Sequence, residues 1–250
     1  MPGPPRNEII AATLRDEILR GRFREGERLP SERDLADRFE AHRGTVREAL
    51  KKLEQLGLAE IRPGGARVCP IQNASLDVVE HLLALEDPPD PHIVDEVLEV
   101  FSGLFAHAAR LGVERADEAQ RARARTLIDR MLDDALDAKA RHETMHQLSD
   151  LFVEASGNSV LSLVRRGVKT HFLERLEDHE GLLTPEAPKR KPALRRLADA
   201  LEARDGSEAA DAILELAAFL RQHAVAVLEA ARAEPRKLGA SGAQSARGAH

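Results

Sequence analysis

The sequence predicts a mainly α-helical protein, in which an N-terminal winged helix-turn-helix with a small β-hairpin wing precedes an all-α bundle of six or seven helices. Apolar residues recur at helical spacing in the first 60 positions, beginning with Ile10, Leu14 and Ile18. Two short β-prone runs flank the turn at 63–65. From Ser75 onward, Leu, Ala and Val recur at helical spacing, and no stretch alternates as a strand would.

The first module is predicted to hold three helices and a hairpin. The apolar spacing predicts a first helix over about 7–20. Ser31, a hydroxyl residue with an acid three positions later, predicts the capped start of a short second helix. A third helix ends at Gly57 and carries the apolar residues Val46, Leu50 and Leu53. Three helices followed by a hairpin form the winged helix-turn-helix plan.

Proline and glycine punctuation divides the rest of the chain into helical segments. They are expected near 76–86, 91–111, 115–139, 142–156, 158–180, 189–204 and 207–232. The predicted organisation is a winged module over 1–70, a linker over 71–76 and a helical domain over 77–233. Residues 234–250 lack apolar periodicity and are expected to form a disordered tail.

Composition excludes several classes of protein. The 250 residues are 42% hydrophobic and 32% charged, which is enough for packed cores. Without Trp or Tyr, and with only seven Phe, the chain is a poor candidate for single-strand nucleic-acid binding by stacking. The single cysteine, Cys69, excludes an internal disulfide framework and a Cys-rich zinc site. Without an apolar run of membrane-spanning length or a signal core, the sequence predicts a soluble, cytoplasmic protein with no membrane partner.

Charge is distributed unevenly along the chain. Residues 1–70 hold 14 Lys and Arg against 12 Asp and Glu, whereas the other 180 residues hold 23 against 31. A cationic patch on an otherwise acidic protein can contact a polyanion at one place. In the third helix, Arg43, Arg47 and Lys51 follow one another at i, i+4 and i+8, on a predicted solvent-facing stripe of one charge.

A helix of this kind fits the major groove of duplex DNA, and residues near its start contact base edges. Arg43 is therefore placed to read bases, and the small residues Gly44 and Thr45 permit close approach. Phosphate contacts are expected from Arg33 on the second helix and from Arg62 or Arg67 on the wing. The alternative is a solvated cationic face, but the helix spacing together with the wing favours double-stranded DNA.

The run 26–68, GERLPSERDLADRFEAHRGTVREALKKLEQLGLAEIRPGGARV, resembles the DNA-binding domain of the GntR family of bacterial transcription regulators. The LPSER, TVREAL and LGL elements carry the resemblance. It implies that the wing turn at 63–64 enters the minor groove and that the operator is contacted by Arg33, Arg43, Thr45 and Arg47. The sequence departs from the family at Ala41 and His42, where an apolar residue and Ser or Thr are usual. We expect His42 to weaken the helix cap and to alter one phosphate contact. The predicted DNA contacts are Arg33, His42, Arg43, Gly44, Thr45, Arg47, Lys51, Arg62 and Gly64.

The segments 75–87, 153–164 and 197–213 resemble the all-helical, FCD-type effector domain of the FadR-type subfamily. In many relatives this domain holds a metal ion through an acid or His and three further His, but the corresponding positions here are Met145, Ser149, Leu194 and Ala217. The arginine that relatives use for an effector carboxylate is Phe101 here. No metal or cofactor is therefore expected. An acyl-CoA or another organic acid is the expected effector, with candidate contacts at Phe101, Phe105, Phe152, Lys169 and Phe172. The alternative for the phenylalanines is ordinary core packing.

Residues 142–146 also match H-E-x-x-H, the zinc-protease signature, through His142, Glu143 and His146. A third ligand would have to come from another helix, with His171, Glu174 and His179 as candidates. A metalloprotease-like protein is therefore the alternative interpretation, and a metal site using His146 and His223 without catalysis stays open.

The sequence as a whole predicts a transcription regulator, not an enzyme, whose affinity for its operator is controlled by a small-molecule effector. One winged head covers too few base pairs for genomic specificity. Two heads on a two-fold dimer that reads a palindrome supply it. The expected partners are therefore double-stranded DNA with a palindromic operator, a small-molecule effector and a second copy of the chain.

Overall fold

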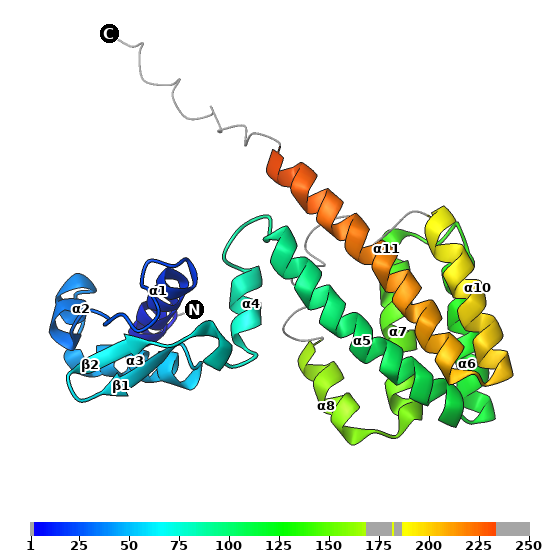
Figure 1. Ribbon diagram of the computed structural model, residues 1–250, viewed down its shortest axis with the longest axis horizontal. Helices are drawn as coiled ribbons and strands as arrows, with labels where there is room; N and C mark the ends of the chain where they lie inside the picture. Colours follow the sequence, from blue (N-terminus) through cyan, green and yellow to red (C-terminus); the bar gives the residue numbers. More distant parts are fainter. Residues whose placement is uncertain (1–2, 169–181, 183–186, 234–250) are drawn as a thin grey trace, which may run out of the picture. The chain divides into compact units, whose positions relative to one another are not determined.

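The computed structural model describes residues 3–168, 182 and 187–233 (Figure 1). The chain divides into two compact units, one made of residues 1–93 and 157–179, the other of residues 94–156 and 180–250. No helix among the described residues is both long and apolar enough to cross a membrane.

The first unit contains the predicted winged helix-turn-helix. Its helices are α1 (Arg6–Leu19), α2 (Glu32–Arg38) and α3 (Arg43–Gln55), followed by strands β1 (Ala59–Arg62) and β2 (Gly65–Val68). The strands pair antiparallel, with Ala59 opposite Val68, and a two-residue turn joins them. The core of this unit is built from the apolar positions that predicted the helices, including Ile10, Leu14, Ile18, Leu35, Val46, Leu50 and Leu53. The three helices and the hairpin are thus confirmed.

Local signals set the ends of these helices. The Ser31 side chain accepts a hydrogen bond from the Asp34 backbone N–H at 3.2 Å, which confirms the predicted cap of α2. Gly57 ends the third helix with φ of +69°, as its position predicted. A β-carbon at Gly57 would lie 2.4 Å from the Asn73 carbonyl oxygen, so both the backbone angle and the space require glycine.

The chain after the wing stays packed on the first unit. It forms a short 3-10 helix, η1 (Ile71–Asn73), and then α4 (Val78–Leu83). Val78 is buried in the same core as α1 to α3. His81 Nε2 lies 3.3 Å from Arg15 Nη1 on α1, and the Arg20 guanidinium donates to the Leu85 carbonyl. The unit also includes α8 (Ser159–Val168).

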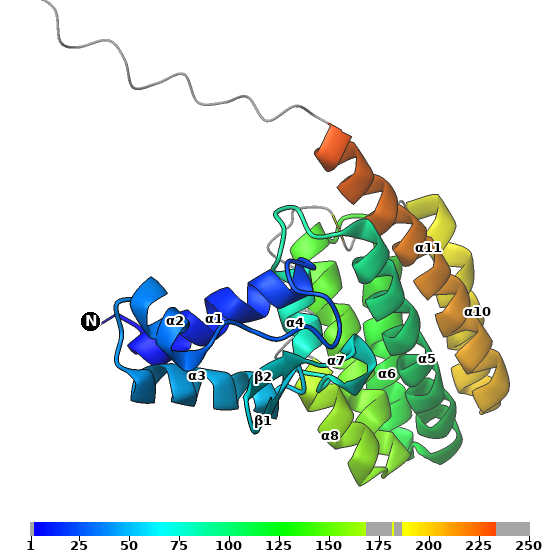
Figure 2. The same cartoon turned by 60° about the vertical axis from the view of Figure 1, so that its left-hand side comes forward.

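The second unit is a helical bundle. It consists of α5 (Pro91–Arg115), α6 (Glu118–Leu132), α7 (Ala138–Ser156), α10 (Ala187–Ala203) and α11 (Gly206–Ala233) (Figure 2). Helix α10 packs on α11 and α6, and α6 packs on α7. Their apolar faces form one core, which includes Ile128, Met131, Leu148, Phe152, Leu194, Leu197, Leu201 and Ile213. The prediction of a helical bundle is confirmed, although the segment 169–181 and the tail after 233 lie outside the described residues.

Three predicted helix ends in this bundle were wrong. Helix α5 continues through Gly112 to Arg115, because Gly112 is a point of close contact with α7 rather than a helix end. A β-carbon there would lie 2.8 Å from the Phe152 carbonyl oxygen. The predicted segment 115–139 ends at Leu132, and α7 begins at Ala138 because the Asp137 side chain accepts the Ala140 backbone N–H at 2.7 Å.

Glu17 is a charged residue in the interior of the first unit. Its side chain, on α1, is 9% exposed and accepts hydrogen bonds from Arg38 of α2 at 2.6 and 2.9 Å and from Arg22 at 3.0 Å. The hydrogen bonds from Arg38 and its charge hold the pKa of Glu17 below its usual value of 4.5, against the opposing effect of burial. The carboxylate therefore ties α1 to α2.

We expect Glu17→Gln to destabilise this unit by about 1–2 kcal/mol at pH 7, because the arginines lose their counter-charge. Hydrogen exchange of the α1 and α3 amides measures the loss. A folded-state pKa below 4.5 means that the stabilisation is present above that value and disappears as the pH falls through the lowered pKa. The difference in the free energy of unfolding between Glu17→Gln and the unsubstituted chain should therefore become smaller below pH 4.5. Glu25→Gln, at an exposed position, serves as the control, and an equal loss there would contradict the assignment.

Candidate nucleic-acid interface

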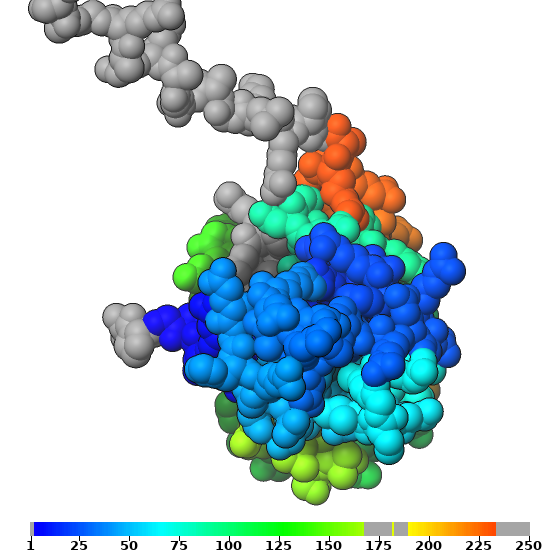
Figure 3. Space-filling view, turned by 90° about the vertical axis from the view of Figure 1, so that its left-hand side faces the viewer, coloured from blue at the N-terminus to red at the C-terminus, as the bar shows by residue number. Residues whose placement is uncertain are grey.

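Helix α3 separates an apolar face from a polar one. Val46, Ala49, Leu50 and Leu53 are buried in the core of the first unit. His42, Arg43, Gly44, Arg47 and Lys51 are exposed, and Thr45 is half-buried. The space-filling view shows the light-blue residues of α2 and α3 beside the cyan residues of the hairpin on one face of this unit (Figure 3). The predicted DNA contacts lie on α2, α3 and the wing of this one unit.

The start of α3 is open to an approaching ligand. His42 occupies the N-cap position and its side chain makes no capping hydrogen bond, as the substitution of the usual hydroxyl predicted. Arg43 is the first helical residue, and its guanidinium forms no ion pair or hydrogen bond with the residues that the structure describes. At the neighbouring Gly44, an added β-carbon would meet nothing within 4 Å. The backbone here can therefore approach a partner closely.

The rest of the basic stripe on α3 is paired with carboxylates. Glu32 of α2 holds Arg47 through two contacts, Nε to Oε1 at 3.0 Å and Nη2 to Oε2 at 2.8 Å. The hydrogen bonds and charge of Arg47 lower the pKa of Glu32, and those of Glu32 raise the pKa of Arg47. Lys51 Nζ lies 3.0 Å from Glu48 Oε1. The predicted stripe of one charge is thus corrected, because two of its three cations already have a partner within the protein.

The remaining phosphate candidates differ in what they contact. Arg33 is exposed, with its Nε 3.7 Å from Asp34 Oδ1, and Arg62 pairs with Glu60 across 2.6 Å. Gly64, in the wing turn, is exposed and has φ of +102°, a value that favours glycine. Arg67 instead donates to the Gly26 carbonyl at 2.9 Å, so it holds the loop that precedes α2. Between the two wing arginines, Arg62 is the better phosphate candidate.

Pairs of this kind are weak in water, because both charges keep most of their hydration. A DNA phosphate can therefore replace the carboxylate partner of Arg47, Lys51 or Arg62 without a large cost. Arg43 forms no ion pair with a described residue, although its charge helps to lower the pKa of Glu32. On this surface Arg43 can contact a phosphate or a base directly. Arg47, Lys51 and Arg62 must first exchange a carboxylate partner for a phosphate.

Two family models match this chain. The family model described as "Bacterial regulatory proteins, gntR family" matches residues 6–68, and the FCD domain model matches residues 96–219. The HTH-type transcriptional regulator Mce2R of Mycobacterium tuberculosis (strain CDC 1551 / Oshkosh) is 31% identical over 222 residues, with 84% of this chain and 89% of the relative covered. The chain belongs to the GntR family. It is a transcription regulator of that family with an FCD effector domain, as the motifs of the sequence predicted.

Other relatives of this GntR-family chain span its length to different degrees. The galactonate operon transcriptional repressor of Escherichia coli (strain K12) is 26% identical, with 85% of this chain and 94% of the relative covered. The fatty acid metabolism regulator protein of Edwardsiella ictaluri (strain 93-146) is 29% identical, with 62% and 64% covered. Among solved structures, Streptococcus agalactiae GntR aligns with a TM-score of 0.45 at 20% identity, covering 86% of this chain and 99% of that one.

The FCD domain of the GntR-family chain brings two of the predicted effector residues together. The rings of Phe105 and Phe152 have centroids 6.3 Å apart, and Phe152 is fully buried in the bundle core. Phe101 is half-buried on α5. Lys169 and Phe172 lie outside the described residues. Among the positions that the resemblance assigned to metal ligands, Leu194 and Ser149 are buried, and Met145 contacts the core cluster.

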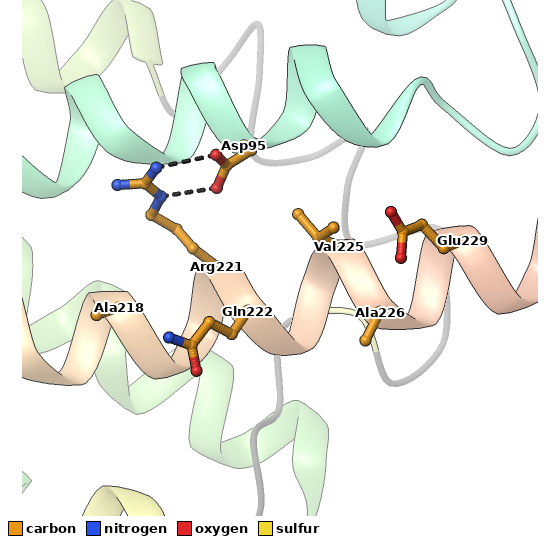
Figure 4. Close-up of a pocket in the computed structure, with 7 residues that line it drawn as sticks. All are labelled: Asp95, Ala218, Arg221, Gln222, Val225, Ala226 and Glu229. Carbon is orange, nitrogen blue, oxygen red and sulfur yellow. Dashed lines mark hydrogen bonds and ion pairs between the residues drawn. The ribbon is translucent and has the colours of Figure 1, made fainter.

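A surface groove on the FCD domain follows α11 and the start of α5. It is lined by Asp95, Ala218, Arg221, Gln222, Val225, Ala226 and Glu229 (Figure 4). Arg221 donates two hydrogen bonds to Asp95, at 2.8 and 2.9 Å, and one to Glu99 at 2.8 Å. The guanidinium therefore joins α11 to α5. None of the predicted effector residues within the described ranges lines this groove.

The H-E-x-x-H motif lies on α7 of the GntR-family chain. His142 and His146 approach each other, with 2.7 Å between their Nε2 atoms, and Glu143 is exposed. Within the described part of the chain, no group of three or more His, Cys, Asp or Glu side chains could hold a metal ion. The third-ligand candidates His171, Glu174 and His179 lie outside the described residues.

Proposed function

We propose that this regulator binds duplex DNA sequence-specifically, with α3 in the major groove and the wing turn against the minor groove. The observation that supports this best is the exposed Arg43 at the start of α3, beside the open backbone of Gly44. Arginine contacts guanine through two parallel hydrogen bonds, and recognition helices read bases with their N-terminal residues. Thr45 and Arg47 lie in the same first turns, where they can contact neighbouring bases or phosphates.

Arg33, Lys51, Arg62 and His42 are assigned to the sugar-phosphate backbone in this proposal. Contacts of this class fix the register of the protein on the duplex but carry no sequence information. Lys51 is a suitable residue for testing the assignment, because it lies two helical turns after Arg43, far from the base-reading end of α3.

We expect Lys51→Ala to weaken binding to all duplexes by a similar factor, whatever their sequence. A plot of the logarithm of the binding constant against the logarithm of salt concentration has a negative slope. The magnitude of this slope should decrease by about one for each Lys51 that contacts a phosphate. Fluorescence anisotropy at several salt concentrations measures both effects. Lys139→Ala, which removes an exposed lysine of the FCD domain, should change neither. A loss confined to one DNA sequence would contradict the backbone assignment.

The protein acts as a homodimer on a palindromic operator in this proposal, because a single head contacts too few base pairs to select one genomic site. Selection of bound duplexes from a random-sequence pool tests the central claim. We expect enrichment of an inverted repeat whose half-sites are related by a two-fold axis. Recovery of sequences without a common motif would disprove sequence-specific binding.

The FCD domain is proposed to bind a small organic acid or an acyl-CoA that changes the affinity for the operator. Its support is the apolar character of positions Met145, Leu194 and Phe152, which suits an acyl chain better than a metal-bound small acid. An effector acts only through its different affinities for the DNA-competent and DNA-incompetent states. Titration of the operator complex with acyl-CoAs and with small organic acids separates the two ligand classes. Release by the small acids alone would eliminate the acyl ligand.

A further inference from the structure

Two imidazole rings converge on one face of α7. His142 and His146 are four residues apart, so the helix places them one above the other. Their Nε2 atoms are 2.7 Å apart, and the rings stand nearly perpendicular, with centroids at 4.3 Å. One ring nitrogen donates a hydrogen bond to the other in such a contact, and both Nε2 atoms point toward the same small region of space.

This separation suits two ligands of the same metal ion. Imidazole nitrogens bind late divalent metals at about 2.0–2.1 Å, which places two cis ligands of an octahedral or square-planar ion about 2.9 Å apart. Two ligands of a tetrahedral ion lie further apart, at about 3.3 Å. The observed 2.7 Å is closer to the cis arrangement, so only a small adjustment of the two side chains is required.

The histidine pair is separate from the packed face of α7. Leu148 and Phe152 are fully buried in the bundle core, and Thr144 is buried as well, whereas both histidines are half-buried. Water can therefore reach the pair and supply further ligands. Substitution of either histidine also removes less packing than a change in the core would.

We propose that His142 and His146 form a two-imidazole site for a late divalent transition metal, with Cu²⁺ and Ni²⁺ favoured over Zn²⁺ and with no affinity for Mg²⁺. The preference follows from the cis geometry and from the nitrogen donors, which suit copper, nickel and zinc but not magnesium. The site does not depend on the proposed DNA binding, and its test uses no DNA.

Calorimetric titration of the full chain with Ni²⁺, after removal of metals with a chelator, tests the site. We expect His142→Gln and His146→Gln each to weaken Ni²⁺ binding at least about tenfold, because the second imidazole then no longer binds within the same molecule. His107→Gln removes an exposed histidine of α5 and should leave the affinity unchanged. Binding that is insensitive to both α7 substitutions, or equally sensitive to His107→Gln, would overturn the proposal.

Electron paramagnetic resonance of the unsubstituted chain with one equivalent of Cu²⁺ gives an independent measurement that no folding defect of a variant can affect. Hyperfine coupling to two equatorial imidazole nitrogens is expected. Coupling to one nitrogen, or to none, would overturn the proposal, as would an affinity for Zn²⁺ above that for Ni²⁺.

Discussion

Replacement of Arg43 by alanine should remove the preference of this regulator for its operator while leaving weak, salt-dependent binding to other DNA. Arg43 is exposed at the first position of α3, where a side chain can reach the edges of the bases. A bidentate arginine–guanine contact contributes about 1–3 kcal/mol of discrimination. In a dimer with two heads on a palindrome, this loss in free energy is incurred twice. Competition between operator and random duplex, followed by anisotropy, measures the specificity ratio.

A control variant that removes one positive charge far from α3 distinguishes the loss of a base contact from a general loss of electrostatic attraction. Arg123 is an exposed arginine of α6, so Arg123→Ala changes the net charge equally without touching the first unit. We expect this variant to keep the specificity ratio of the unsubstituted chain. If Arg43→Ala lowered the affinity for operator and random duplex by the same factor, Arg43 would be a phosphate contact, and another residue would have to read the bases.

The winged module was predictable because its signals are local. The apolar spacing of Val46, Leu50 and Leu53 specifies which face of α3 is buried. The Ser31 cap marks the start of α2, and Gly57 marks the end of α3. These features depend on neighbours within one or two helical turns. The outward direction of Arg43 followed from the same periodicity.

The electrostatic state of the interface was harder to predict, because it depends on a contact across the helix-turn-helix. Glu32 lies 15 residues before Arg47, and only the angle between α2 and α3 brings the two side chains into a bidentate pair. The pairing of Lys51 with Glu48 could have been found, since a spacing of three residues is a standard helical pair. Counting basic residues along one stripe therefore overestimates its net charge.

Helix ends in the bundle were missed for two different reasons. Asp137, an acid just before the start of α7, is a cap signal that the sequence contains. At Gly112 a helix end was predicted where the helix continues. The sequence alone does not distinguish a glycine that ends a helix from a glycine that allows two helices to pack closely. Only the position of Phe152 on the neighbouring helix distinguishes them.

That distinction gives a stability prediction for α5. Alanine has a helix propensity about 1 kcal/mol better than that of glycine, so propensity alone predicts that Gly112→Ala stabilises the helix. A β-carbon at position 112 would, however, lie 2.8 Å from the carbonyl oxygen and 2.9 Å from the Cα of Phe152. Overpacking of this kind costs about 1–3 kcal/mol, because α5 and α7 must move apart. We expect a net destabilisation, visible as faster hydrogen exchange of the amides in both helices.

Gly103 on the same helix provides the matched control. It is exposed, and a β-carbon there would meet nothing within 4 Å. Gly103→Ala should therefore show the propensity effect alone and stabilise the FCD domain by about 0.5–1 kcal/mol. The two substitutions are chemically identical and lie nine residues apart in one helix, so opposite signs can only come from the contact with α7. Stabilisation by both would mean that α5 and α7 are not packed against each other at Gly112.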